Sequence, residues 1–356
     1  MNDESFLDLI EELLAKYGAK WQYIADQIGD KPERIRSAWR RSGRELPDRE
    51  NNPEAELALH IEFTNKKETG NVDWREFIKL AEHGKGISDR LDITQKAAEI
   101  HIKTEKPIAV VYTGDWHLGD RAIDYKTWID HISLILDNNN VFMIDMGDEI
   151  QNMRSFKMLS TVLDQVLSPT QQAAMMHSII DELTEGNKII AKILGNHDSE
   201  FDERLFGDSV EKYFLSKLKA PIFNNRGLLD LMVGEQTYTN LLFHKSRFKS
   251  SARPAQGALK EWQMGYPAEV VVGGHDHIPA AEIMWGYGLA SDNNRGFGGE
   301  VYLLKIGSFQ DSDLGWKYYN GSNPTCIMPT VVYFPHEHRK MLFMNASDAI
   351  QFLKGY

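Results

Sequence analysis

The sequence predicts an α/β protein, in which a layered domain of strands and helices follows a small all-α unit. Three observations predict this fold class. From Lys106 onward, short apolar runs rich in β-branched residues alternate with stretches of helical spacing. Residues 1–45 show helical spacing alone, whereas residues 46–105 are polar and poorly periodic. We therefore expect a helical unit at 1–45, a connector with some helix at 46–105 and the large domain at 106–356.

The composition is that of an ordinary globular protein, with 42% hydrophobic and 26% charged residues in a chain of 356. A single cysteine, Cys326, excludes an internal disulfide framework and fits a reducing compartment. The acidic, amphipathic N-terminus is unlike a signal peptide, and no apolar stretch approaches the length of a membrane span. These features predict a cytoplasmic protein with no membrane partner, and they are compatible with a homo-oligomer.

Three short helices are predicted in the N-terminal unit. They cover residues 5–18, 21–29 and 31–43. A glycine ends each of them, and Pro32 stands in the first turn of the third. Ile35 and Trp39 lie four residues apart, so we expect both to face inward beside Trp21 and Ile24.

The third of these helices is basic. Within this segment Lys31, Arg44 and four further arginines are opposed only by Glu33. Three short helices with a basic last helix resemble a helix-turn-helix or Myb-like unit, in which that helix enters the major groove of DNA. We expect contacts to DNA from Arg34, Arg36, Arg40 and Arg41. The alternative is a bundle whose solvated face is basic, or one that docks on another protein. The net charge of −12 argues against non-specific coating of nucleic acid but permits a local basic patch.

The connector contains two segments that we expect to be helical, residues 73–84 and 88–103. The large domain contains eight strand-like runs. They lie at residues 107–114, 141–147, 188–195, 238–244, 268–274, 300–307, 330–334 and 341–345. Helical spacing occupies residues 125–138 and 169–186 between them. Strands that alternate with helices in this way predict a layered α/β domain.

Polar side chains follow five of these strands. They occur in "TGDWHLG", "MGDEIQN", "LGNHDSE", "LLFHKSR" and "VGGHDHI". In an open α/β sheet, ligands bind outside the carboxyl ends of the strands. Each motif alone fits an ordinary turn, since glycine and asparagine favour turns. Five in succession are difficult to explain by turns, so we expect their side chains to meet at one site.

The residue types in these motifs favour metal binding. Imidazole, carboxylate and one amide oxygen, without thiolate, suit Mn²⁺, Fe, Zn²⁺ or Mg²⁺. The motifs offer seven candidate ligands. They are Asp115, His117, Asp148, Asn196, His244, His275 and His277. Seven are too many for one ion of ordinary coordination number, but they suit two ions that share one carboxylate. Such a pair clamps the oxygens of a phosphate ester and activates water. The sequence therefore predicts a phosphoester hydrolase with two divalent ions.

The motif order D-x-H, G-D, G-N-H-D, H, G-H-x-H resembles that of the calcineurin-like metallophosphoesterases over about residues 107–310. The resemblance implies a layered β-sandwich flanked by helices. It also implies that Asp115, His117 and His277 hold one metal, that Asn196, His244 and His275 hold the other, and that Asp148 bridges them. His197 would protonate the leaving oxygen, and Asp198 would orient His197.

Within that superfamily, "DWHLGD" and "GNHD" look most like the DNA double-strand-break repair nucleases, which usually use manganese. The resemblance and the basic helix together predict a DNA nuclease with two Mn²⁺ ions. Two departures are present: Gln151 stands where those nucleases usually have a histidine, and only about fifty residues follow the core, too few for their DNA-capping domain.

Two other functions stay open. The chain could be a phosphomonoesterase or small-nucleotide phosphodiesterase whose helical unit serves assembly. It could also be a DNA-binding regulator with a vestigial metal site, although the complete ligand set argues against this.

Several other polar residues need no catalytic explanation. His336 and His338 form a second His-x-His without partner motifs, so we interpret them as surface or turn residues. The remaining histidines outside the motifs that we expect to be packed or solvated are His101, His131 and His177. Lys245 and Arg247, just after His244, could bind flanking phosphates or lie in an ordinary solvated loop.

Overall fold

A computed structural model describes residues 3–17, 21–44, 60–64, 94–152, 164–197, 215, 218–250, 252–265, 268–289, 296–310 and 326–356. The chain divides into two compact units, Met1–Leu59 with Leu136–Asn139 and His60–Ile135 with Asn140–Tyr356. Asp198 and the expected helix at 73–84 lie outside the described residues.

The N-terminal unit contains the three predicted helices. They are α1 (Asp3–Tyr17), α2 (Trp21–Ile28) and α3 (Pro32–Ser42). Gly43 follows α3 with a φ of 67°, a left-handed conformation that glycine adopts without strain. The helices bury a small apolar core that includes Ile24, Ile35 and Trp39, with Trp21 packed at its edge. This arrangement confirms the inward orientation predicted from the spacing.

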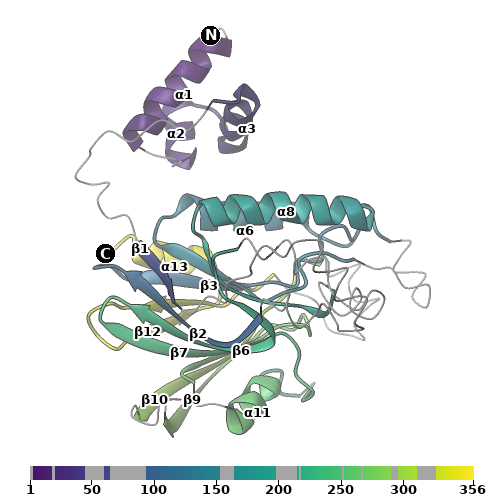
Figure 1. Ribbon diagram of the computed structural model, residues 1–356, viewed down its shortest axis with the longest axis vertical. Coiled ribbons are helices and arrows are strands. Elements are labelled where there is room, and N and C mark those ends of the chain that lie inside the picture. Colours follow the sequence, from purple (N-terminus) through teal and green to yellow (C-terminus); the bar gives the residue numbers. More distant parts are fainter. Residues whose placement is uncertain are drawn as a thin grey trace, which may run out of the picture. The chain divides into compact units, whose positions relative to one another are not determined.

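The second unit contains a mixed sheet of twelve strands with helices between them (Figure 1). The strands are β1 (His60–Thr64), β2 (Thr94–Lys103), β3 (Ile108–Thr113), β4 (Val141–Asp145), β5 (Ile189–Ile193), β6 (Ile222–Val233), β7 (Gln236–Phe243), β8 (Val270–Gly273), β9 (Ala280–Leu289), β10 (Gly296–Lys305), β11 (Thr330–Tyr333) and β12 (Lys340–Phe343). The helices are α6 (Tyr125–Asp137), α8 (Pro169–Glu185), α11 (Gln256–Met264) and α13 (Ala346–Leu353). The main strand order is β12-β11-β3-β4-β5-β6-β7-β8-β10-β9.

The prediction of a helix over 88–103 is wrong where the structure describes this segment. Residues Thr94–Lys103 form strand β2, which pairs with β1 and β6. Ala98, Ile100 and Ile102 are buried and alternate with more exposed residues, a period of two that defines a half-buried strand. Both β1 and β2 precede residue 106, where the sequence predicts that the large domain begins, and both belong to its sheet.

The sheet curls until its two halves face each other. Four strand spacings separate β3 from β7 in the strand order, which is roughly 19 Å in a flat sheet. Nevertheless the hydroxyl of Tyr112, on β3, donates to Oδ1 of Asn240, on β7, over 2.6 Å. Tyr333, on β11, reaches the same oxygen over 2.8 Å. All three side chains are buried, so this contact lies between two sheet layers and confirms the predicted sandwich.

Strand β6 joins the two layers. Its first residues pair in parallel with the end of β5, where Phe223 lies opposite Ile193. Its later residues pair antiparallel with β7, where Arg226 lies opposite Phe243. The carboxyl ends of β5 and β7 therefore meet at nearly the same point of β6, although β7 runs in the opposite direction. The sequence predicted that the polar strand ends meet, and the structure brings them together where the sheet folds over at β6.

Helices cover the outer faces of the sandwich. Figure 1 shows α6 and α8 on one side of the curled sheet and α11 on the other. Ser168 begins α8 with a reciprocal capping box, in which its hydroxyl accepts from the backbone of Gln171 and the Gln171 side chain accepts in return. Within the described residues, no helix is both long and apolar enough to cross a membrane.

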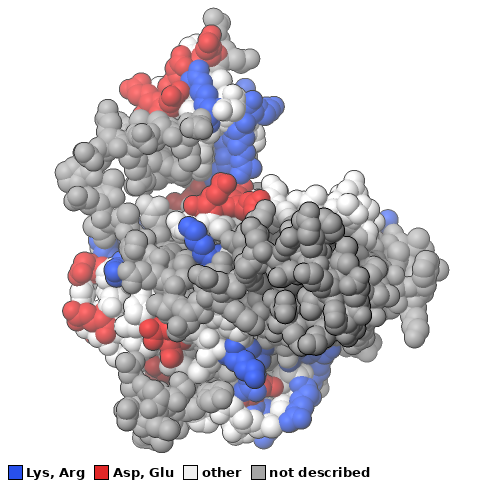
Figure 2. Space-filling model, viewed as in Figure 1, with Lys and Arg blue, Asp and Glu red and all other residues white. Residues whose placement is uncertain are grey.

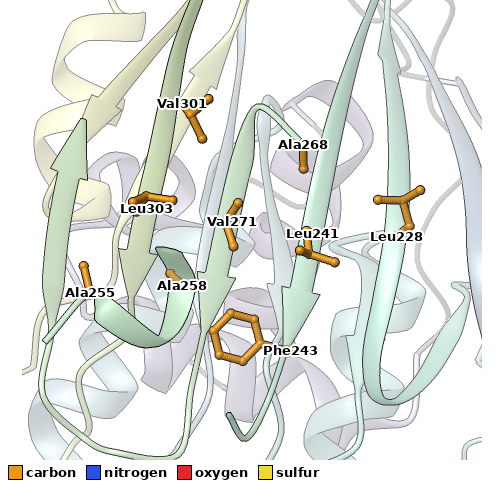
Figure 3. Close-up of a cluster of buried hydrophobic side chains, with 9 residues drawn as sticks. All are labelled: Leu228, Leu241, Phe243, Ala255, Ala258, Ala268, Val271, Val301 and Leu303. Carbon is orange, nitrogen blue, oxygen red and sulfur yellow. The ribbon is translucent and has the colours of Figure 1, made fainter. Parts of the chain in front are cut away.

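Helix α11 anchors the half of the sheet that contains β7, β8 and β10. Figure 3 shows the apolar side chains that pack there. They are Leu228, Leu241, Phe243, Ala255, Ala258, Ala268, Val271, Val301 and Leu303. Trp262 of α11 packs against this cluster and donates from its indole N–H to the carbonyl of Ala268 over 3.0 Å. The cluster thereby fixes β7 and β8, whose carboxyl ends carry three of the predicted ligands.

Candidate metal centre

The structure brings the predicted ligands together at the ends of five strands. Each ligand lies in the segment that follows β3, β4, β5, β7 or β8. They are Asp115, His117, Asp148, Asn196, His244, His275 and His277. Five of them are at most 2% exposed, and only Asn196 and His275 are half-buried. His197, the predicted proton donor, is buried beside them.

Unusual backbone conformations are concentrated in these segments. Seven described residues other than glycine have a positive φ, and six of them lie in the segments after β3, β4 and β8. The six are Asp115, His117, Asp148, Asn152, His275 and His277. L-residues rarely adopt this region, and such strain accumulates where a side chain must be aimed at a functional site.

Two glycines allow the segments after β4 and β5 to approach closely. Gly147 has a φ of 89°, and a Cβ there would lie 2.5 Å from the backbone nitrogen of Gly195. A Cβ on Gly195 would overlap the carboxylate of Asp148. The "GD" and "GN" sequences are therefore needed for backbone contact as well as for turn formation.

The first grouping contains Asp115, His117 and His277. One ligand atom from each lies within 4.8 Å of the others. Nε2 of His117 is 3.0 Å from Nε2 of His277. Oδ1 of Asp115 is buried and accepts no hydrogen bond from the described residues. A buried carboxylate oxygen without a donor is costly unless a cation compensates it, so these three residues fit a divalent ion.

The second grouping contains Asp148, His244 and His275. Nε2 of His244 lies 3.0 Å from Oδ2 of Asp148 and 3.2 Å from Oδ1 of Asn196. Nδ1 of His244 is 2.8 Å from the carbonyl oxygen of Met146. Because a carbonyl can only accept, Nδ1 carries the proton and Nε2 faces the grouping as a ligand.

A third grouping, His117, Asp148 and His197, overlaps both. Asp148 belongs to the second and third groupings, as a shared carboxylate would. His197 is held by its backbone N–H, which donates to Oδ1 of Asp148 over 2.8 Å. Its Nδ1 lies 2.6 Å from the carbonyl oxygen of Gln151 and therefore donates to it. Geometry alone thus allows His197 to act as a ligand or as a proton donor through Nε2.

The electrostatics of the site follow from burying many ionisable groups together. Burial raises the pKa of Asp115 well above its usual value, and the nearby carboxylate of Asp148 adds to this. Burial opposes ionisation of Asp148 as well, but His244 and His197 outweigh it and hold its pKa well below the usual value. Asp148 in turn raises the pKa of His244 to about 10 despite burial. A cation at Nε2 of His244 would compete with a proton there, so we expect metal affinity to increase with pH.

A buried ion cluster supports the segment after β4. Nζ of Lys192, on β5, lies 3.2 Å from Asp145 and 2.5 Å from Glu149, and all three side chains are fully buried. Asp145 also accepts from the backbone N–H of Gly147 over 3.0 Å. This cluster was not predicted from the sequence. Its signal was the lysine inside the apolar run "IIAKIL", which has to find a partner when buried.

Other supporting residues were also missed. Asn152 donates from Nδ2 to the carbonyl of His197 over 2.8 Å. Gln310 lies 3.1 Å from Nδ1 of His277, and Ser308 donates to the carbonyl of Asp115 over 2.9 Å. The last two follow β10, so the same rule that found the ligands, polar residues at a strand end, would have found them.

The histidines outside the five motifs also lie outside these groupings. His336 is exposed beside Glu105, and His338 lies 2.9 Å from Glu269. His101 contacts Glu99, whereas His131 is buried in α6. None of them, nor His177, belongs to a metal-type grouping among the described residues.

Residues 108–279 match the family model described as calcineurin-like phosphoesterase. This range contains every predicted ligand. Among solved structures, the chain is similar to the nuclease MPE of Pseudomonas putida, with 14% identity over 66% of this chain and 87% of that one, at a TM-score of 0.28. No curated protein matches the chain. The family match and the buried groupings together identify a metal-dependent phosphoesterase domain.

Proposed function

We propose that this chain, whose residues 108–279 form a calcineurin-like phosphoesterase domain, is a nuclease that hydrolyses phosphodiester bonds of DNA with two divalent cations. The observation that carries the proposal is the convergence of seven nitrogen and oxygen ligands from five strand ends around Asp148. Asp148 belongs to two of the three groupings, and a pair of ions could share such a carboxylate.

The residues divide into two ligand sets. Asp115, His117 and His277 would hold one cation. Asn196, His244 and His275 would hold the other, with Asp148 between the two sets. Mn²⁺ is the favoured ion, and Fe, Zn²⁺ and Mg²⁺ suit the same ligands. When bound, such ions neutralise phosphate charge and lower the pKa of water.

His197 would supply a proton in the reaction. The Gln151 carbonyl accepts from Nδ1, so the ring is held in one orientation. In the doubly protonated ring, Nε2 would carry the proton that is transferred. The backbone N–H of His197 donates to Asp148, so His197 lies beside the carboxylate that would bridge the two cations. In this role Nε2 gives its proton to the oxygen that leaves phosphorus. Asp198 would orient His197, although it lies outside the described residues.

Two basic residues next to the site suit the phosphates that flank the scissile bond. Lys245 and Arg247 directly follow His244, and both are exposed. Among the described residues, neither forms an ion pair, whereas Lys249 pairs with Asp276 in the same segment. Figure 2 shows basic side chains gathered over the region of α11, which follows this segment. Cations beside the ligands would attract the many phosphates of a polyanion more strongly than a small phosphoester with one or two charges.

The helical unit supplies the second argument for DNA. Arg34, Arg40 and Arg41 are exposed, and on the helical wheel of α3 they point away from the face that buries Ile35 and Trp39. Arg36 lies nearer the core, with its guanidinium 5.8 Å from the ring of Trp21. We propose that these four arginines contact DNA, with Arg36 placed less favourably than the others.

The basic surface is smaller than the sequence indicated. Asp30 pairs with Arg34 over 3.3 Å, and Asp8 and Glu11 both pair with Arg44 over 2.7 Å. The expectation that only Glu33 opposes this set is therefore wrong, because acidic residues of other segments fold beside it. This neutralisation favours the alternative function, a phosphomonoesterase or small-nucleotide phosphodiesterase whose helical unit serves assembly.

Charge reversal on α3 separates the two functions. The double substitution Arg40→Glu with Arg41→Glu should weaken DNA binding and flatten its dependence on salt, by roughly 0.9 in the log–log slope for each phosphate that is no longer neutralised. Hydrolysis of a chromogenic phosphodiester should be unchanged. Fluorescence anisotropy over a salt series measures both affinity and slope.

The matched control places the same charge change elsewhere, at the exposed residues Lys96 and Lys354, each replaced by glutamate. We expect this control to bind DNA nearly as the unmodified chain does. Equal affinity and slope in the arginine double variant and the unmodified chain would remove the DNA role of α3 and leave assembly as its function.

A further inference from the structure

We infer that Gln151 and Gln310 are positioning residues, which hold His117 and His277 as Nδ1–H tautomers so that both Nε2 lone pairs point at one cation. This inference rests on the proposed metal centre. It adds two side chains that bind no metal but determine whether the first ligand set can do so.

The orientation of the Gln151 amide is fixed by its two partners. Its Nε2 donates to Oδ2 of Asp120 over 2.7 Å, because a carboxylate oxygen cannot donate when ionised. Its Oε1 consequently faces Nδ1 of His117, over 2.8 Å. An amide oxygen only accepts, so Nδ1 of His117 carries the proton and Nε2 carries a lone pair.

Asp120 is itself held in place. It is 1% exposed, and its Oδ1 accepts from the backbone N–H of Ala122 over 2.9 Å. Its own backbone N–H donates to the carbonyl of His117 over 3.1 Å. His117 and Asp120, the residue that holds the Gln151 amide in place, therefore belong to one turn. A relay from Asp120 through Gln151 to His117 follows from these bonds.

Gln310 serves His277 in the same way from a different strand end. Its Oε1 lies 3.1 Å from Nδ1 of His277. Its backbone N–H donates to the hydroxyl of Ser308, which donates to the carbonyl of Asp115. Gln310 is therefore linked through Ser308 to the backbone of Asp115, a residue of the same ligand set, as well as to the imidazole of His277.

The two glutamines together create an arrangement that needs a cation. With both protons on Nδ1, two Nε2 lone pairs face each other across 3.0 Å, and no hydrogen bond can form between them. Oδ1 of Asp115 lies beside them without a donor among the described residues. Residues that support metal-bound histidines in this manner affect metal affinity strongly when they are changed.

Gln310→Met removes the acceptor and nearly conserves the volume. We expect the first cation to bind about 10–100-fold more weakly, the usual effect of losing such a partner, while the second site changes less. Gln310→Glu keeps an acceptor oxygen and should restore tight binding. Titration of the chelated full-length protein with Mn²⁺, followed by electron paramagnetic resonance, measures both sites. Gln263→Met, on the exposed face of α11, is the control.

Gln151 permits a reciprocal exchange. Gln151→Glu alone should weaken the first site, because its second oxygen would face the carboxylate of Asp120. In the double variant with Asp120→Asn, the new amide N–H at position 120 can donate to the new carboxylate at position 151. The affinity of the first site for Mn²⁺ should then largely recover. Failure of the double variant to bind better than Gln151→Glu would contradict the relay.

A spectroscopic measurement tests the tautomers themselves. Nitrogen-15 chemical shifts of the imidazoles in the chelated protein should show Nδ1–H for His117 and His277. A proton on Nε2 of either ring, or full Mn²⁺ affinity in Gln310→Met, would overturn the inference. Failure of the proposed function is distinct: a protein that binds two ions with these tautomers yet cleaves no phosphoester would refute the nuclease and leave the positioning intact.

Discussion

Asp148→Asn should abolish phosphoester hydrolysis on every substrate. The substitution removes the charge that we propose the two ligand sets share, and it leaves His244 without the carboxylate that lies 3.0 Å from its Nε2. Losing a residue that only supports a ligand costs about 10–100-fold, so losing the shared ligand should cost more than ~100-fold in kcat/KM. Metal content, measured by mass spectrometry on the dialysed protein, should fall in parallel with the rate.

The control for Asp148→Asn is the same chemical change at Asp130, an exposed residue of α6 that pairs with Lys126. Asp130→Asn should leave metal content and rate unchanged. Because Asp148 also accepts from the backbone of His197, a loss of rate with full metal content would mean that the carboxylate only positions His197. That outcome would contradict its place between two cations.

His197→Ala should slow hydrolysis without removing metal. It should lower the rate of DNA cleavage by roughly 10²–10⁴, the usual contribution of a positioned proton donor. The loss should be much smaller for a nitrophenyl ester, because nitrophenolate leaves without a proton and the 3′ oxygen of DNA does not. Parallel rate measurements on both substrates, with metal analysis, separate these effects.

Asn196→Ala is the matched comparison, since it changes the neighbouring residue but removes the proposed ligand oxygen, which lies 3.2 Å from Nε2 of His244. We expect it to lower occupancy of the second site and to affect both substrates alike. If His197→Ala also loses metal, then His197 is a ligand, as its grouping with His117 and Asp148 allows. Equal losses on the two leaving groups would mean that His197 only positions the phosphate.

The sequence predicted which side chains come together because each motif is encoded locally. A strand end, a glycine and a polar residue are neighbours in the chain, and "GNHD" carries its own evidence of a turn. It could not predict how the ends of β5 and β7 meet, because that depends on β6, a strand of mixed apolar and polar residues that pairs with both. Nor did it predict β2, whose alternation at Ala98, Ile100 and Ile102 was overlooked within a polar segment.

Supporting contacts were harder to predict than ligands because their partners are distant in sequence. Lys192 reaches Glu149 across 43 residues, and Gln310 reaches His277 across 33. The pairing of Arg44 with Asp8 is of the same kind, and it reduces a basic surface that seemed continuous along the chain. Composition gives the charges of such residues but not which of them fold side by side.

The proposed function depends most on two divalent cations that act together on a phosphodiester. The direct measurement is a titration of the chelated full-length protein with Mn²⁺, in which bound ions per chain and hydrolysis of bis(4-nitrophenyl) phosphate are followed together. We predict that about two ions bind and that hydrolysis approaches its maximum only as the second site fills. Saturation at one ion, or two bound ions without hydrolysis above the metal-only background, would contradict the proposed function.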